Sequence, residues 1–242
     1  MPNQFRQAGY TLVELLVALI ILAIISAVAV RSLQKTVVVS RTEETKAEME
    51  SLAHAIAGNP SLVSNGVRTD YGYVGDVGAL PPTLTALSAN PGSYATWRGP
   101  YLQDNLVVSV GASSTDITMD AWGTTYAYSP AGGTITSTGG GSAMTRPIAN
   151  SATDLLVNQV SVSITDLSGK SPGTTYDDSI RVILTIPNGI GGTTTRQLTP
   201  SSGGWAQFDS IPIGTHPLTV VYLPYSDTLK REVHVDPGKA YS

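Results

Sequence analysis

No cysteine occurs among the 242 residues of this sequence. Disulfide bonds and zinc sites built from cysteine are therefore excluded, and packing and hydrogen bonds must hold the fold together. Charge is scarce as well, because Asp, Glu, Lys and Arg make up only 13% of the chain. With 14 basic and 18 acidic residues the net charge is −4, which offers no basic face for a nucleic acid. We expect no nucleic-acid partner.

Glycine and proline are absent from one long stretch, although the whole chain carries 24 Gly and 15 Pro. Neither residue occurs in the 48 positions between Gly9 and Gly58. Both residues disfavour the interior of a helix, so this gap predicts one continuous helix over residues 10–57, roughly 70 Å long. Gly58 and the nearby Pro60 predict its C-terminal end.

The first part of this helix has the composition of a membrane anchor. Residues 10–30 are apolar apart from Thr11, Glu14 and Ser26. A helix of about 20 residues spans the hydrocarbon core of a bilayer. These residues therefore predict a transmembrane segment.

The second part, residues 31–57, is polar and amphipathic. Met49, Leu52 and Ile56 recur at helical spacing with Ala53 beside them, which predicts a stripe that packs on a globular body. The charged residues on the other faces are expected in solvent or in contacts between subunits: Arg41, Glu43, Glu44, Lys46, Glu48 and Glu50. This part is interpreted as a stalk.

Glu14 requires an explanation, because a carboxylate within an apolar span costs about 2.5–3.5 kcal/mol on insertion scales. One interpretation places it at the headgroups, where the positive end of the helix dipole stabilises an acid. The other pairs it with a free α-amine created by cleavage after Gly9. The segment Met1–Gly9 has no apolar region of its own and is no ordinary secretory signal. This composition favours cleavage.

The run Gly9-Tyr10-Thr11-Leu12-Val13-Glu14 resembles the processing motif of type IV prepilins and type II secretion pseudopilins. The resemblance implies that residues 1–9 are a leader peptide, which a prepilin peptidase removes after Gly9. It also implies N-methylation of Tyr10 and a contact between Glu14 and the amine of a neighbouring subunit during filament assembly. Tyr10 stands where phenylalanine is commoner in these families.

Two further motifs lie in residues 58–129, the predicted globular domain. The sequence contains Trp97, Gly99, Pro100 and Tyr101 in one run, and a second run holds Asp120, Trp122, Gly123 and Tyr126. These runs resemble the W-x-G-P-Y-L and D-x-W-G-x-x-Y-x-Y pattern of major pseudopilins. We interpret their aromatic residues as core, closing a small sheet onto the Leu52 and Ile56 stripe. Short strands are predicted at Leu106–Val110 and Tyr126–Tyr128.

Residues 130–153 are rich in Gly, Ser, Thr and Ala and are predicted to form a flexible hinge. Major pseudopilins usually carry a calcium loop at this point. Here no acidic residue follows until Asp154, and calcium needs six or more oxygen ligands. We predict no metal and no cofactor, although Asp154 would be the last acid of such a loop.

The last part, residues 154–242, changes to alternating apolar and polar residues, which predicts a small antiparallel β-sandwich. Its separate core predicts a domain that folds alone. The run from Gly204 to His216 resembles a turn of transthyretin-like, carboxypeptidase-regulatory-type domains. The expected core residues alternate along the strands: Val162, Ile164, Val182, Leu184, Trp205, Phe208, Val220 and Val235.

The whole sequence therefore predicts an α+β fold. A long N-terminal transmembrane and stalk helix packs on a small pilin-type antiparallel sheet, and a small all-β sandwich follows. The three histidines, His54, His216 and His234, lack metal-ligand spacing and are expected at the surface or at caps. No catalytic constellation is present among the motifs, so we expect a protein that is not an enzyme.

The leading hypothesis for function is a structural subunit of a type II secretion pseudopilus. The alternative is a type IV pilus or surface-fibre subunit whose sandwich binds an external target. The resemblance implies a helical homo-oligomer, minor pseudopilins, the prepilin peptidase, an inner-membrane assembly platform and the inner membrane as partners. It also implies a single-pass inner-membrane protein with its globular part in the periplasm. Arg31, Lys35 and Arg41 follow the span, so a positive-inside count alone favours the opposite orientation.

Overall fold

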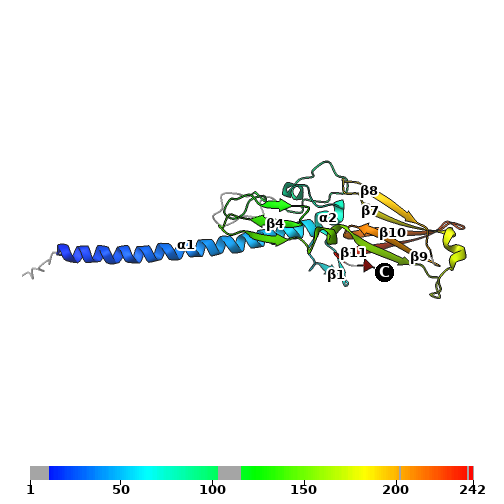
Figure 1. The fold of residues 1–242 in the computed structure, drawn as a ribbon, viewed down its shortest axis with the longest axis horizontal. Coiled ribbons are helices and arrows are strands. Elements are labelled where there is room, and N and C mark those ends of the chain that lie inside the picture. Colours follow the sequence, from blue (N-terminus) through cyan, green and yellow to red (C-terminus); the bar gives the residue numbers. More distant parts are fainter. Residues whose placement is uncertain (1–10, 103–115, 202, 239, 242) are drawn as a thin grey trace, which may run out of the picture. The chain divides into compact units, whose positions relative to one another are not determined.

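The computed structural model describes residues 11–102, 116–201, 203–238 and 240–241, and Figure 1 shows its ribbon. The chain divides into two units, Met1–Glu43 and Glu44–Ser242.

Helix α1 runs without interruption over Leu12–Ala57, 46 residues in all. At its start, the backbone N–H of Glu14 donates to Thr11 Oγ1 at 3.3 Å, a side-chain cap of the kind that threonine provides. At its end, Gly58 adopts a φ of +80° and its N–H donates to the His54 carbonyl at 2.6 Å. The left-handed conformation favours glycine, so the predicted end of the helix is confirmed.

In the first unit, the side chains of α1 are exposed from Leu12 to Val39. The helix is long and apolar enough to cross a membrane, and none of its most apolar window is buried within the protein. This surface has the properties expected of an anchor in lipid.

In the second unit, the last turns of α1 are buried on one side. Met49, Leu52, Ala53 and Ile56 are at most 3% exposed, which confirms the predicted stripe. Glu48 is also buried, at 8% exposure, so its predicted place in solvent is wrong. The reason is a hydrogen bond from the hydroxyl of Tyr126, which lies far away in sequence.

Short elements surround this end of α1. They form a hairpin, two short helices and a three-stranded antiparallel sheet of order β3-β4-β5. Their apolar residues share one core with the α1 stripe, and the largest fully buried side chains among them are Tyr73, Leu87 and Ile135. The bounds are β1 Val63–Ser64, β2 Val67–Arg68, α2 Gly72–Val77, η1 Leu84–Leu87, β3 Ala127–Ser129, β4 Thr134–Ser137 and β5 Met144–Pro147.

The prediction of a flexible hinge at residues 130–153 is wrong, because regular elements lie there. Strands β4 and β5 form an antiparallel pair within this range, and helix α3, Ala152–Leu156, begins at its end. Ile135 in β4 is fully buried and anchors the pair to the core. The glycines supply the turn between the strands, with Gly141 at a φ of +80°. The predicted strand Leu106–Val110 lies outside the described residues.

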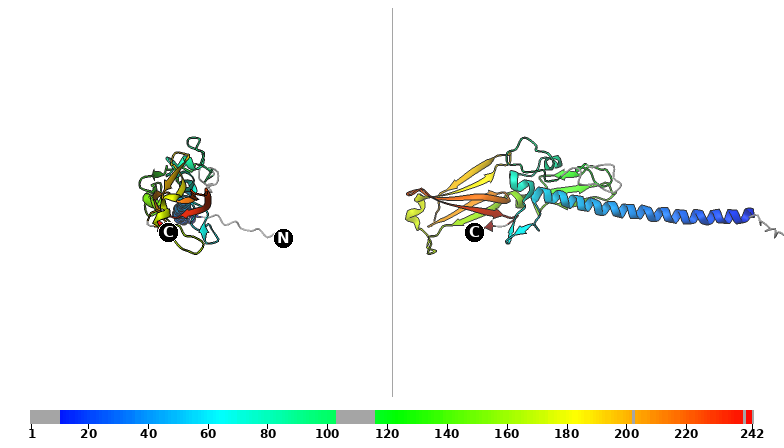
Figure 2. Two further views of the ribbon diagram at one scale, coloured as in Figure 1. Left: turned by 90° about the vertical axis from the view of Figure 1, so that its right-hand side faces the viewer. Right: turned by 180° about the vertical axis from the view of Figure 1, so that it is seen from behind.

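The remaining residues form two facing sheets, as predicted for a β-sandwich. One sheet has the order β11-β10-β7-β8 and the other the order β12-β6-β9. Figures 1 and 2 show the strands of both sheets running to one end, where the 3₁₀ helix η2, Thr174–Ser179, lies. The strands are β6 Asn158–Ser163, β7 Ile180–Pro187, β8 Thr193–Leu198, β9 Trp205–Ile211, β10 Gly214–Tyr222, β11 Asp227–Val235 and β12 Ala240–Tyr241.

The core between these sheets matches the predicted alternation with one exception. Val182, Leu184, Phe208 and Val235 are at most 2% exposed. Trp205 is 41% exposed, so its predicted place in the core is wrong. Ala206 and Phe208 face inward along β9, and the period of two sends Trp205 to the other side. Val162, Ile164 and Val220 are half-buried at the edge of this core.

Within the unit Glu44–Ser242, the sandwich packs directly on the elements around α1. Leu155 and Ile213 are fully buried in the core that α1 shares with Ile135, not in the sandwich core. The N–H of Gly189, after β7, donates to the Val77 carbonyl of α2 at 2.8 Å. The two predicted domains therefore meet through buried side chains and backbone hydrogen bonds.

Candidate functional site

Glu14 lies in the first turn of α1, next to the predicted cleavage position. Its neighbours Leu12 and Val13 are 83% and 69% exposed, so its carboxylate stands on an apolar surface that the chain itself leaves uncovered. In lipid a carboxylate in this position needs a partner from outside its own helix. Gly9 and Tyr10 lie outside the described residues.

Asp120 organises the second signature run. Its carboxylate accepts hydrogen bonds from the N–H groups of Trp122 at 3.0 Å and Thr124 at 2.8 Å. It also accepts from Ser137 Oγ at 2.5 Å and from the Gly139 N–H at 3.2 Å. Four donors satisfy this carboxylate, which is only 3% exposed. Asp120 therefore ties its own loop to strand β4 and to the turn after it.

The structure of this loop explains why glycine stands at position 123 and at positions 139 and 140 after β4. Gly123 adopts a φ of +80°, which closes the turn through its N–H to the Asp120 carbonyl at 2.8 Å. A side chain at Gly139 would approach Asp120 Oδ2 to 2.5 Å, and one at Gly140 would approach the Trp122 ring to 3.0 Å. The glycine run is therefore a close-packed surface beneath Asp120 and the half-buried Trp122.

The same loop is fastened to α1 by two polar contacts. The Ala121 N–H donates to Thr45 Oγ1 at 3.3 Å, and Tyr126 Oη donates to Glu48 Oε2 at 2.6 Å. Burial and the adjacent Glu48 raise the pKa of Tyr126 far above its ordinary value, so its hydroxyl stays protonated and donating. Sequence reasoning missed Thr45 and Glu48. Thr45 and Glu48 are three residues apart and therefore lie on one face of α1, next to the apolar stripe. This spacing is the one local signal that they contact the globular body.

The first signature run packs on α2 and η1. Trp97 Nε1 donates to the Ala86 carbonyl at 3.0 Å, and Tyr101 Oη donates to Asp76 Oδ2 at 2.7 Å. The Tyr101 ring meets the Trp97 and Tyr73 rings edge to face, each at a centroid distance of 5.7 Å. Trp97 and Tyr101 are only partly buried and pack against the shared core.

Gly99 and Pro100 connect these two aromatic residues through a cis peptide bond. A side chain at Gly99 would lie 2.4 Å from the Trp97 ring, so the ring covers the glycine directly. The signature residues in both runs therefore position loops on the body.

Asp76 borders a polar cavity of about 480 Å³ between α2 and the β10 end of the sandwich. Burial raises the pKa of Asp76 above its ordinary value, and the Tyr101 hydroxyl and the Arg98 guanidinium 3.8 Å away oppose that shift. His216 also lines the cavity. It is 1% exposed, so its predicted place at the surface or at a cap is wrong.

His216 is hydrogen-bonded to the backbone beside it. Its Nε2 lies 2.8 Å from the Pro212 carbonyl, which can only accept, so Nε2 carries the hydrogen. Burial lowers the pKa of His216 below its ordinary value. The other two histidines are less buried: His54 Nε2 lies 3.1 Å from Glu50, and His234 Nδ1 lies 3.0 Å from Thr215 Oγ1.

Asp154 forms hydrogen bonds with the N-cap residue Ser151 at the start of α3. Its carboxylate accepts from Ser151 Oγ at 2.9 Å, and its N–H donates back to the same hydroxyl at 3.2 Å. Across the described ranges, no group of three or more His, Cys, Asp or Glu side chains lies close enough to hold a metal ion. The absence of a metal stays a prediction for the whole chain.

Comparison with known proteins gives one informative match. The family model described as the prokaryotic N-terminal methylation motif matches residues 4–30. No curated protein and no solved structure matches the chain. The matched range includes Gly9, Tyr10 and Glu14 and extends into the exposed apolar part of α1.

Proposed function

We propose that this chain, a type IV pilin-like or pseudopilin subunit by its N-terminal methylation motif, is a structural subunit of a type II secretion pseudopilus. The motif implies processing by a prepilin peptidase and assembly into pilin-type filaments. Together with the apolar helix it fits a single-pass membrane anchor. We assign the anchor to the inner membrane and the unit Glu44–Ser242 to the periplasm.

One observation carries the choice of a pseudopilus. The two signature runs resemble the major pseudopilin pattern, and the second of them is fastened to the stalk helix through Tyr126 and Glu48. A loop that is bound to α1 by buried hydrogen bonds holds the globular part in a fixed place on the helix within this unit. A filament subunit needs that rigidity, because its neighbours contact both parts.

Assembly uses Glu14 in this proposal. After cleavage behind Gly9, the new α-amine of Tyr10 in one subunit pairs with the Glu14 carboxylate of a neighbour and removes the cost of an isolated charge in lipid. Minor pseudopilins and the inner-membrane assembly platform are the further partners. The role is mechanical, and we assign no catalytic step and no cofactor to the chain.

A deletion of the gene tests this function. Cells without the chain should accumulate exported proteins in the periplasm, and the wild-type gene should restore their secretion. Normal secretion together with the loss of surface fibres would contradict the pseudopilus and support the alternative subunit, that of a type IV pilus or surface fibre.

The alternative is favoured by one feature of the sandwich. Tyr176 and Tyr225, at the end that carries η2, are 51% and 78% exposed. Exposed tyrosines are typical of surfaces that recognise other molecules. In a surface fibre this end would contact an external target.

A further inference from the structure

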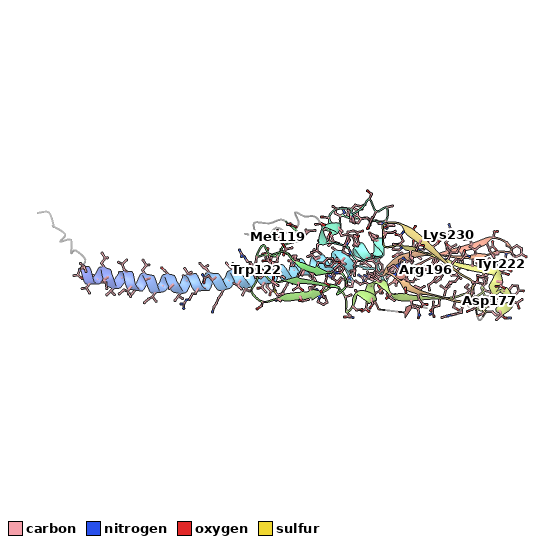
Figure 3. All side chains as sticks on the ribbon, turned by 45° about the horizontal axis from the view of Figure 1, so that its top comes forward. Met119, Trp122, Asp177, Arg196, Tyr222 and Lys230 are labelled. Atoms are coloured by element: carbon pink, nitrogen blue, oxygen red, sulfur yellow. The ribbon has the colours of Figure 1, made fainter. Side chains whose placement is uncertain are left out.

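The end of the sandwich that carries η2 contains a pocket of about 500 Å³. Figure 3 labels Tyr222 and Asp177 at this end of the strands. The volume lies in the range of ligand-binding pockets in proteins. We call it the tip pocket.

The floor of the tip pocket is the open end of the sandwich core. Ile164 follows β6 in one sheet, whereas Ile180 and Val220 belong to β7 and β10 of the other. Tyr176 and Tyr222 form its aromatic sides. Apolar groups from both sheets therefore meet at a place that solvent can reach.

Aromatic and apolar side chains extend beyond the pocket. Tyr225 packs on Tyr222 with ring centroids 5.8 Å apart, and Leu223 is 45% exposed. Leu167, on the neighbouring loop, is fully exposed. Tyrosines with serine and glycine on loops at one end of a β-sandwich also form the combining sites of antibodies, because tyrosine provides contact area at a low entropic cost.

Two acidic side chains of this end accept hydrogen bonds from loop backbone. Asp166 accepts from the N–H groups of Ser168 at 2.8 Å and Lys170 at 2.9 Å. Asp177 accepts from the Gly203 N–H at 3.1 Å. Apolar and aromatic side chains make up most of the pocket lining, so the pocket suits a hydrocarbon or aromatic group better than a saccharide.

Lys170 is the basic residue of the pocket lining, where the acidic residue Asp166 already accepts two backbone hydrogen bonds. Its side chain is exposed at the pocket wall, and its ammonium has no ion-pair partner within the described residues. An acidic group on a bound molecule would complement this charge.

We propose that the tip pocket binds an extended polypeptide segment, which inserts an apolar side chain between Tyr176 and Tyr222 and places an acidic group beside Lys170. The site is formed by one chain, so this inference does not depend on the proposed filament function.

The experiment uses the detergent-solubilised full chain and a display library of short random peptides. Selected peptides should share an apolar residue next to Asp or Glu. Tyr176→Ala should weaken the binding of the synthesised peptides by at least about tenfold, as for a central aromatic contact. Lys170→Glu should reverse the charge preference, so that selection yields Lys or Arg next to the apolar residue.

Two matched variants control for general surface effects. Ile190→Ala removes an exposed apolar side chain from the turn at the other end of β7, and Lys230→Glu reverses an exposed charge on β11. Both should keep the affinity within about twofold. Thermal unfolding checks that Tyr176→Ala and Lys170→Glu stay folded.

Three results would overturn the proposal. One is a selection that yields no peptide with measurable affinity, and another is peptide binding that Tyr176→Ala leaves unchanged. The third is binding on a glycan array that requires Tyr176, because the pocket would then recognise a saccharide. An unchanged charge preference in Lys170→Glu would remove the assigned role of Lys170 and contradict the acidic part of the segment.

Discussion

A single charged side chain, that of Glu14, interrupts the apolar residues between Leu12 and Val30 of α1. Glu14→Ala removes an insertion cost of about 2.5–3.5 kcal/mol, so the chain should stay in the membrane. It also removes the proposed partner of the neighbouring amine, so the yield of sheared filaments relative to membrane-bound chain should fall several-fold.

The matched control for this change is Glu43→Ala, an exposed acid on the same helix beyond the apolar span. It should leave the yield unchanged. Normal assembly of Glu14→Ala would show that apolar packing, not charge pairing, holds the subunits together.

His216 makes the stability of the folded chain depend on pH. Its folded-state pKa lies below the ordinary value, so the unfolded chain binds the proton more readily. The resulting stability is present above the ordinary histidine pKa and is lost as the pH falls through and below it. The melting temperature should therefore drop between about pH 7 and pH 5.

His216→Phe should make this part of the pH profile flatter, because phenylalanine does not titrate. His234→Phe changes a half-buried histidine on the neighbouring strand that contributes less to the lowered pKa of His216 than burial does, so it should retain most of the slope. An identical slope in both variants would assign the effect to other groups. Differential scanning fluorimetry of the purified full chain provides the measurement.

Among the elements, the loop from Asp120 to Tyr126 depends on its attachment to α1. Tyr126→Phe removes the hydroxyl that donates to Glu48 at 2.6 Å in a buried place. A hydrogen bond to a charged group is worth about 1.5–3 kcal/mol, so the free energy of unfolding should fall by that amount. Chemical denaturation of the full chain measures it.

A double-mutant cycle separates this contact from its surroundings. Glu48→Gln and the double variant should show that the two single effects do not add, because each removes the same bond. Tyr225→Phe changes an exposed tyrosine and should alter stability by less than about 0.5 kcal/mol. Strict additivity would contradict the coupling.

Elements with a clear period could be predicted from the sequence. The gap in Gly and Pro predicts a helix over residues 10–57, and α1 is found at Leu12–Ala57. Gly58 ends this helix because its backbone adopts the left-handed conformation. Alternation along β7 predicts Val182 and Leu184 in the core, and both are fully buried. In these cases the period of the chain alone decides which face is buried.

Elements that depend on distant partners could not be predicted. Glu48 is buried because Tyr126, 78 residues away, donates to it. The glycines after β4 resemble a linker by composition, yet their lack of side chains is what lets Asp120 and Trp122 lie on them. The Asp120 loop of the candidate site was recognised by its resemblance, while its attachment to Thr45 required the structure.

The unit Glu44–Ser242 as a whole should not separate cleanly into body and sandwich. Truncation after Asn150 removes Leu155 and Ile213 from the core that contains Ile56 and Ile135. Loss of one such residue to alanine costs about 2–5 kcal/mol, so the truncated body should lose its cooperative unfolding transition.

Processing should survive this truncation, because Gly9 and Tyr10 belong to the other unit. Mass spectrometry of membrane fractions should still find a mature chain that begins at Tyr10 and carries an N-methyl group. Gly9→Leu is the control that should block cleavage in the full-length and truncated chains. A truncated chain that unfolds cooperatively at the wild-type temperature would show that the body folds independently of the sandwich.

The exposed apolar surface of α1 determines whether the molecule is found in water, in the bilayer or in a polymer. Large apolar side chains from Leu12 to Val39 are exposed, and removing one of them from water is worth about 1.5–3 kcal/mol. Water is therefore not a solvent for the free subunit, and growth of a pilin-type filament is a partition between the bilayer and the polymer. The critical concentration of such a system is an areal density, counted in molecules per unit of membrane. The bilayer acts as the reservoir that sets the chemical potential of the subunit, and dilution of the surrounding aqueous compartment leaves that potential unchanged.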